Sequence, residues 1–93
     1  MRRVPSVVLT PHLRRFFDLP DRIEAEGKTV AEVLTTLDAR WPGLAFYVMD
    51  EQGRMRQHVA IWVNGRRVED RERLADPVES DGVVTILQAL SRG

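Results

Sequence analysis

The stretch from residue 29 to residue 41 has the clearest helical pattern in the chain. Thr29 followed by Glu32 forms a capping box that starts a helix, and Pro42-Gly43 ends it. Between them, five apolar side chains recur at helical spacing and form one stripe: Val30, Val33, Leu34, Leu37 and Trp41. A single helix with one apolar stripe must bury that stripe against another element, and the segments around it have strand-like patterns.

Two strands are predicted before the helix. Residues 4–10 are rich in β-branched side chains, and Pro5 stands near the start of the segment, where a strand tolerates proline. Residues 21–26 alternate apolar and charged side chains and stop at Gly27. We expect these two strands to pair antiparallel, joined by a loop over residues 11–20.

Three more strands are predicted after the helix. Residues 57–64 alternate strictly, and Asn64-Gly65 is the dipeptide preferred by a type I′ hairpin turn, so Arg67-Val68 begins a short return strand. Residues 83–89 follow the turn at Asp81-Gly82 and form the last strand. Residues 44–49 are apolar and predict a short helical turn, while the charged segment up to residue 80 is expected to be a loop.

The predicted order of strand, strand, helix, strand, short strand and strand indicates an α+β fold. It would have a mixed four- to five-stranded sheet with one main helix packed on one face. The chain has 93 residues, of which 43% are hydrophobic, and this is enough for one domain spanning residues 1–93 with a short tail at about residues 90–93. If the first and last strands pair at the centre, the tail leaves from one end of the sheet.

Composition excludes several functions. Acidic and basic side chains balance at 14 each, so no net field favours nucleic acid or an anionic membrane, and neither is expected as a partner. There is no cysteine, which removes disulfides, thiolate metal sites and cysteine nucleophiles. Neither a signal peptide nor a membrane-spanning run is recognised, so we expect a cytoplasmic protein.

Short motifs along nearly the whole chain resemble those of the ThiS/MoaD sulfur carriers, which have the β-grasp (ubiquitin-like) fold. The family includes the carrier that serves cysteine biosynthesis in actinobacteria. Each motif is weak alone, but their order and spacing are specific: Leu13-Arg14, Gly27-Lys28-Thr29-Val30, Trp41-Pro42-Gly43-Leu44, the run at residues 59–65 and the run at residues 81–87. The resemblance does not distinguish carriers for thiamin, molybdopterin, cysteine or another thio-metabolite.

This resemblance implies a function at the last residues of the chain. A partner enzyme would use ATP to adenylate the carboxylate of Gly93, and a sulfur donor would convert it to a thiocarboxylate for a sulfur-accepting synthase. Ser91 and Arg92 would be the tail that threads the partner. The chain itself would be no enzyme and would bind no cofactor or metal.

The tail departs from the family pattern, because Ser91-Arg92-Gly93 stands where a small residue and two glycines are expected and Gln88 where a proline is common. Arg92 brings a long cation and a Cβ to a position that must pass through a narrow channel. Two alternatives therefore stay open. One is a ubiquitin-like modifier that transfers the activated carboxylate to a lysine, and the other is an interaction module without carrier activity.

The face of the sheet away from the helix is a second candidate site. Trp62, Ala60 and Leu87 would form an apolar patch there that binds the partner, unless residues 44–49 or a loop cover it. His12 and His58 lie far apart in sequence without a nearby carboxylate at metal-ligand spacing, so we expect surface residues. No phosphate-binding loop or Ser/His/Asp set is found.

Overall fold

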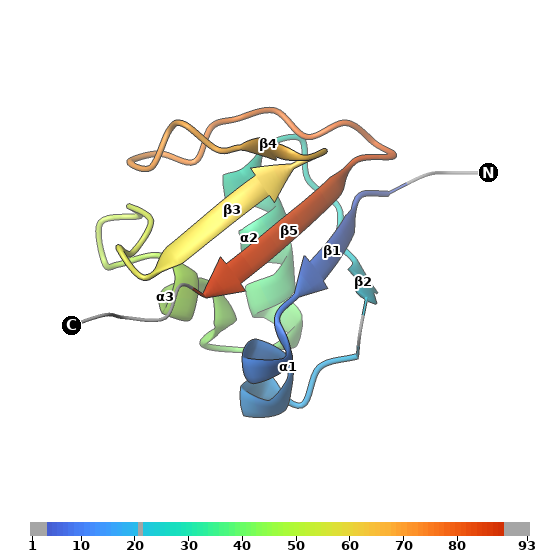
Figure 1. The fold of residues 1–93 in the computed structure, drawn as a ribbon, viewed down its shortest axis with the longest axis vertical. Helices are drawn as coiled ribbons and strands as arrows, with labels where there is room; N and C mark the ends of the chain where they lie inside the picture. The colour runs from blue at the N-terminus through green and yellow to red at the C-terminus, as the bar shows by residue number, and fades with distance from the viewer. Residues whose placement is uncertain (1–3, 21, 89–93) are drawn as a thin grey trace.

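The computed structural model describes residues 4–20 and 22–88 of the chain, which form a twisted sheet with helices on one face (Figure 1). The strands have the order β2-β1-β5-β3-β4 across the sheet. The elements along the chain are β1 (Ser6–Leu9), α1 (Pro11–Phe17), β2 (Arg22–Glu24), α2 (Val30–Arg40), α3 (Leu44–Val48), β3 (Val59–Val63), β4 (Arg66–Arg67) and β5 (Val83–Gln88).

The first and last strands in the sequence, β1 and β5, lie side by side at the centre of the sheet, as expected. β5 pairs parallel with β1, where Val7 lies opposite Val84, and antiparallel with β3, where Ile61 lies opposite Ile86. β2 and β4 pair antiparallel with the outer edges of β1 and β3. The sheet is therefore mixed and has five strands, at the upper end of the expected range.

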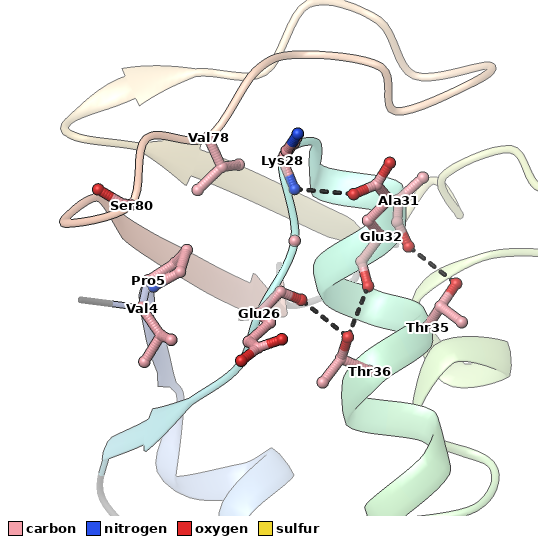
Figure 2. A pocket seen from close by; sticks show the side chains of 11 residues that line it. Val4, Pro5, Glu26, Lys28, Ala31, Glu32, Thr35, Thr36, Val78 and Ser80 are labelled. Atoms are coloured by element: carbon pink, nitrogen blue, oxygen red, sulfur yellow. Dashed lines mark hydrogen bonds between the residues drawn. The ribbon is translucent and has the colours of Figure 1, made fainter. Parts of the chain in front are cut away.

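Helix α2 covers one face of the sheet and begins at the predicted capping box. The Thr29 hydroxyl accepts a hydrogen bond from the backbone N–H of Glu32 at 3.2 Å. The Glu32 carboxylate accepts one from the backbone N–H of Lys28 at 2.9 Å (Figure 2). Four residues of the predicted stripe are completely buried: Val30, Val33, Leu34 and Leu37. The fifth, Trp41, caps the helix end and is only partly buried.

The prediction of a loop over residues 11–20 is wrong for its first part, because residues 11–17 form helix α1. Pro11 occupies the first turn, where a missing N–H is harmless, and Asp18 ends the helix in the left-handed conformation at φ 56°. Leu13 is fully buried and Phe17 packs against the core. Burial of these two side chains, four residues apart, explains why the segment is helical.

The other predicted elements are present with shifted ends. β1 is shorter than residues 4–10 and β2 shorter than residues 21–26, while Asp21 lies outside the described residues. β4 is Arg66–Arg67, one residue before the predicted start at Arg67. β5 ends at Gln88 in the described chain, and Ala89 lies beyond it. Residues 44–48 form α3, which confirms the short helical turn.

The β3–β4 hairpin confirms the predicted turn. Asn64 has φ 52° and Gly65 has φ 81°, the two positive values that a type I′ turn requires. The segment from Val68 to Gly82 contains no named helix or strand, although Val68, Leu74 and Val78 are buried. This loop is therefore anchored by apolar side chains to the same core that α2 covers.

Candidate functional site

Strand β5 leads directly into the tail that sequence analysis predicts to react. Gln88 is the last described residue and lies opposite Val59, the first residue of β3. Ser91, Arg92 and Gly93 lie outside the described residues. Five residues follow Gln88 in the sequence, and a fully extended chain of that length spans at most about 17 Å. A partner that uses the Gly93 carboxylate must therefore approach this end of the sheet closely.

The opposite end of β5 is fixed by hydrogen bonds to the hairpin turn. The Asn64 side-chain oxygen accepts from the backbone N–H of Val83 at 2.8 Å, and the Asn64 N–H donates to the Val83 carbonyl at 2.8 Å. The Ser6 N–H donates to the Gly82 carbonyl at 2.9 Å. A Cβ on Gly82 would lie only 3.1 Å from the Glu79 carbonyl oxygen, so glycine suits this close turn. These contacts fix the register of β5 between its neighbours.

The face of the sheet turned away from α2 is toward the viewer in Figure 1, and strand pairing puts the predicted partner-binding residues on it. Ala60 lies opposite Leu87, and Trp62 lies opposite Thr85, so these four residues share one face. Leu87 is 36% exposed and Trp62 is partly exposed, but Ala60 is only 8% exposed. The structure thus brings the three predicted residues together, and it places little of Ala60 at the surface.

Arg67 of β4 partly covers this face. Its guanidinium lies 5.7 Å from the centre of the Trp62 ring, and the two residues are cross-strand neighbours. A cation over an aromatic face holds the ring in place while leaving the remainder of the patch accessible.

A hollow of about 810 Å³ lies at the other end of the sheet from Gln88, between the start of β1, the start of α2 and the loop at Val78 (Figure 2). Several of its polar groups are used within the fold. The Thr36 hydroxyl lies 2.7 Å from the Glu26 carbonyl and 3.1 Å from the Glu32 carbonyl, and the Thr35 hydroxyl donates to the Ala31 carbonyl. The hollow is therefore remote from the tail and takes no part in the chemistry expected there.

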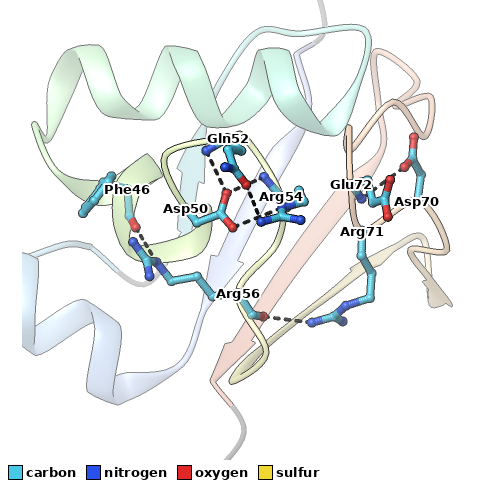
Figure 3. Close-up of polar contacts among 8 residues, drawn as sticks. All are labelled: Phe46, Asp50, Gln52, Arg54, Arg56, Asp70, Arg71 and Glu72. Carbon is cyan, nitrogen blue, oxygen red and sulfur yellow. Dashed lines mark hydrogen bonds and ion pairs between the residues drawn. The ribbon is translucent and has the colours of Figure 1, made fainter.

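A group of contacts that sequence analysis missed lies where β5 ends (Figure 3). The Arg56 guanidinium lies 4.7 Å from the centre of the Phe46 ring, and its Nε donates to the Phe46 carbonyl at 2.8 Å. Arg71 donates from Nη2 to the Arg56 carbonyl at 2.8 Å and to the Val59 carbonyl at 3.3 Å. Phe46 is 55% exposed. No sequence pattern predicts this group, because its members come from three separate segments.

Two aspartates organise the turns beside this group. Asp50 accepts from the backbone N–H groups of Arg54 and Gln52 and pairs with the Arg54 side chain. Hydrogen bonds from backbone N–H groups lower the pKa of both carboxyls from the ordinary value. The largest contribution comes from the Arg54 N–H for Asp50 and from the Arg73 N–H for Asp70. Both carboxylates are explained by these turns and need no catalytic role.

The two histidines lie in separate parts of the fold, His12 in α1 and His58 just before β3. The His58 ring packs edge-to-face against Tyr47 at a centroid distance of 5.7 Å and is partly buried, so it is less exposed than expected. His12 lies in α1, and its side chain is not described. Among residues 4–20 and 22–88, no group of three or more His, Cys, Asp or Glu side chains is placed to hold a metal ion.

The profile of the ThiS family matches residues 13–92 of the chain. The chain belongs to the ThiS family. It is 32% identical over 73 residues to the sulfur carrier protein CysO of Mycobacterium tuberculosis, a match that covers 76% of this chain and 78% of that protein.

Solved structures agree with this membership of the ThiS family. A chain of the Amycolatopsis orientalis BexX/CysO complex superimposes with a TM-score of 0.84 and 25% identity, covering 96% of this chain and 99% of that chain. The crystal structure of Mycobacterium tuberculosis CysO superimposes with a TM-score of 0.82 and 28% identity, covering 92% and 99%. The predicted β-grasp fold and the resemblance to sulfur carriers are confirmed.

Membership of the ThiS family bears on the remaining expectations. Sulfur carrier proteins are small carriers and not catalysts, which agrees with the expected lack of enzyme activity. None of the helices formed by the described residues has the length and apolarity needed to span a bilayer.

Proposed function

We propose that this chain is a sulfur carrier whose terminal residue, Gly93, is adenylated and then thiocarboxylated by a partner enzyme. The observation that carries the proposal is the match of the ThiS family over residues 13–92, which runs almost to Gly93. In this proposal residues 1–93 form one domain, and about residues 90–93 are the tail. Because activation consumes ATP, the carrier would work in the cytoplasm.

The proposed chemistry has two steps. An oxygen of the Gly93 carboxylate attacks the α-phosphorus of ATP, the bond from that phosphorus to the β-phosphate oxygen breaks, and pyrophosphate leaves. Hydrosulfide then attacks the carbonyl carbon of the mixed anhydride, and the C–O bond to AMP breaks. The carboxylate is a poor electrophile until AMP becomes its leaving group, which is why the partner must supply ATP. The chain binds no cofactor of its own in this scheme.

The tail would thread into the partner through Ser91 and Arg92. Gly93 has no Cβ and suits a narrow channel, whereas Arg92 needs more room. A guanidinium beside nucleotide phosphates forms strong, charge-assisted hydrogen bonds, so a channel with space for it gains affinity there. We propose that the partner of this chain has such space at the position next to the reacting glycine.

Two proteins would share the carrier, an adenylating enzyme and a sulfur-accepting synthase. A similar chain has been crystallised in the BexX/CysO complex, which supports a function exercised through partner proteins. In this chain the open face around Trp62 and Leu87 borders the end of β5, so it would contact a partner holding the tail. Trp62 supplies the large aromatic side chain that often anchors such interfaces.

Intact mass spectrometry of the protein purified from its source organism tests the proposal. We expect a species in which one oxygen is replaced by sulfur, located at Gly93 by fragmentation, and absent from a variant in which Gly93 is deleted. An unmodified carboxylate that persists with adenylating enzyme, ATP and sulfide would reject carrier activity. A conjugate to a lysine of another protein, lost on deletion of Gly93, would instead identify a modifier.

A further inference from the structure

The Phe46–Arg56 pair stands out because both the backbone and the side chain of Arg56 are held by contacts within the fold. Its backbone N–H donates to the Val48 carbonyl at 2.9 Å, and its carbonyl accepts from Arg71. Its side chain stacks on Phe46 and donates from Nε to the Phe46 carbonyl (Figure 3). Long side chains at a surface normally lose much rotamer freedom when they bind, and here that loss has already occurred on folding.

The outer nitrogens of this fixed guanidinium are available. Within residues 4–20 and 22–88, Arg56 forms no ion pair with a carboxylate, and no hydrogen bond from either of its Nη atoms is found. In contrast, Arg54 two residues earlier pairs with Asp50. A planar guanidinium with two free Nη groups and fixed orientation is suited to bidentate binding of a carboxylate. The 55% exposed Phe46 ring lies beside it as an apolar contact.

The position of this pair relative to the end of β5 indicates what it would bind. Arg71 links the Arg56 carbonyl to the carbonyl of Val59, and Val59 lies opposite Gln88 at the end of β5. Because Gly93 lies five residues beyond Gln88, a partner that encloses a Gly93 carboxylate would rest against the surface around that strand end. The nucleotide phosphates would meet the far end of an extended tail, so a phosphate is not the group expected at its base.

We propose that Phe46 and Arg56 form a docking point for an acidic side chain of the adenylating enzyme, at the mouth of the channel that receives the tail. This inference rests on the proposed function and adds the contact that would align the carrier body with the channel. Together with Trp62 and Leu87 on the open face, it would hold the end of β5 from two sides. Arg71 is a positioning residue, since it holds the backbone of Arg56.

The test is ATP–pyrophosphate exchange by the adenylating enzyme of the source organism, with the full-length chain as the varied substrate. We expect Arg56→Glu to raise the KM for the carrier about tenfold or more and to change kcat less than about twofold, because docking and not the chemical step is affected. Phe46→Ala should raise KM about threefold to tenfold. Arg66→Glu, an identical charge change on exposed β4, should leave KM within about twofold.

Two further measurements separate docking from folding. Arg56→Gln removes the charge and keeps much of the side-chain volume, and its thermal midpoint is compared with that of the wild type. The KM of the wild type should rise between about 50 and about 300 mM salt, and that of Arg56→Gln should rise less, an effect that a purely structural role would not produce. Equal salt dependence in both proteins would overturn the docking role.

The remaining outcomes are distinguishable. Absence of exchange with the wild-type chain would reject the proposed function and this docking point with it. Normal exchange with an unchanged KM for Arg56→Glu would reject the docking point alone. If Arg56→Glu and Arg66→Glu raise the KM equally, the effect is one of general electrostatics, and the proposal is overturned. A defect of Arg56→Glu that is confined to the later sulfur-accepting step would also overturn it.

Discussion

The two faces of the central strands differ sharply although they are built from adjacent residues. On the side of α2, Ile61 and Ile86 lie opposite each other with no exposed surface. On the other side, Trp62 is partly exposed and Leu87 is 36% exposed. One step along β3 or β5 therefore changes a side chain from a member of the core to a candidate contact for a partner.

The difference between the two faces shows that strand register, more than composition, decides which side chains of β3 and β5 belong to the core and which lie on the open face. Both faces carry large apolar side chains, and a one-residue slip of β5 would exchange them. The contacts of Asn64 with Val83 oppose such a slip from one end of the strand. Substitutions on the two faces should consequently have separable effects, and the following predictions test that separation.

The largest expected effect comes from truncating the buried face. Ile86→Ala should lower the free energy of unfolding by about 2–5 kcal/mol, because it removes buried methyl and methylene groups and leaves a cavity. Leu87→Ala, at the adjacent position, should lower it by less than about 1 kcal/mol. Urea denaturation of both variants gives the comparison. Equal losses would show that the open face is covered in solution.

The next effect concerns binding through the open face. Trp62→Ala should weaken binding to the adenylating enzyme about tenfold to thirtyfold, equivalent to about 1.4–2 kcal/mol, because it removes the largest side chain of the patch. Trp62→Phe keeps an aromatic ring and should recover part of the affinity. Calorimetric titration of the adenylating enzyme with the full-length variants measures these affinities. Unchanged affinity for Trp62→Ala would show that this face is not part of the interface.

A smaller effect is expected from the contacts that fix the register. Asn64→Ala should destabilise the fold by about 1–2 kcal/mol, since it removes the acceptor for the Val83 N–H and places alanine at φ 52°. Asn64→Gly removes the same acceptor and tolerates that φ, so its loss should be smaller. If both variants lose the same stability, the backbone conformation contributes nothing measurable.

The smallest effect is a pH dependence of the stability, arising at the turn formed by Asp70. The carboxylate of Asp70 accepts backbone N–H groups in the turn that places Leu74, whose carbonyl accepts from Ala31 at the start of α2. Because these N–H groups lower its pKa in the folded state, its stabilisation is present above the ordinary value of 3.8 and is lost as pH falls through the lowered pKa.

Asp70→Asn should therefore flatten the acid side of the stability curve. Unfolding free energies measured from about pH 6 to about pH 2 should converge for the wild type and the variant at the acid end. A constant difference across that range would contradict the assignment of the stabilisation to the ionised carboxyl.

Much of this fold could be predicted because its main signals are local. The capping box at Thr29, the alternation of residues 57–64 and the Asn64-Gly65 turn each specify a short segment, and all three are present. Helix α1 was missed since its pattern is short, and only the burial of Leu13 against distant segments makes it stable. Propensity alone does not reveal such tertiary support.

The candidate site was harder to predict than the fold. Alternation correctly put Ala60, Trp62 and Leu87 on one face, but it did not show that Ala60 is only 8% exposed there. The Phe46–Arg56 pair depends on α3 folding back along the segment before β3. Contacts between segments of this kind follow from tertiary packing and have no sequence period.

The parallel pairing of β1 with β5 has a consequence for how the chain folds during synthesis. β5 is made after all the other elements of the described chain, yet it fills the centre of the sheet between β1 and β3. Until residues 83–88 leave the ribosome, those two strands have no common partner, and the pairing closes a long loop of sequence. Pairing of β5 with both β1 and β3 would then join the two halves of the sheet in one late step of folding.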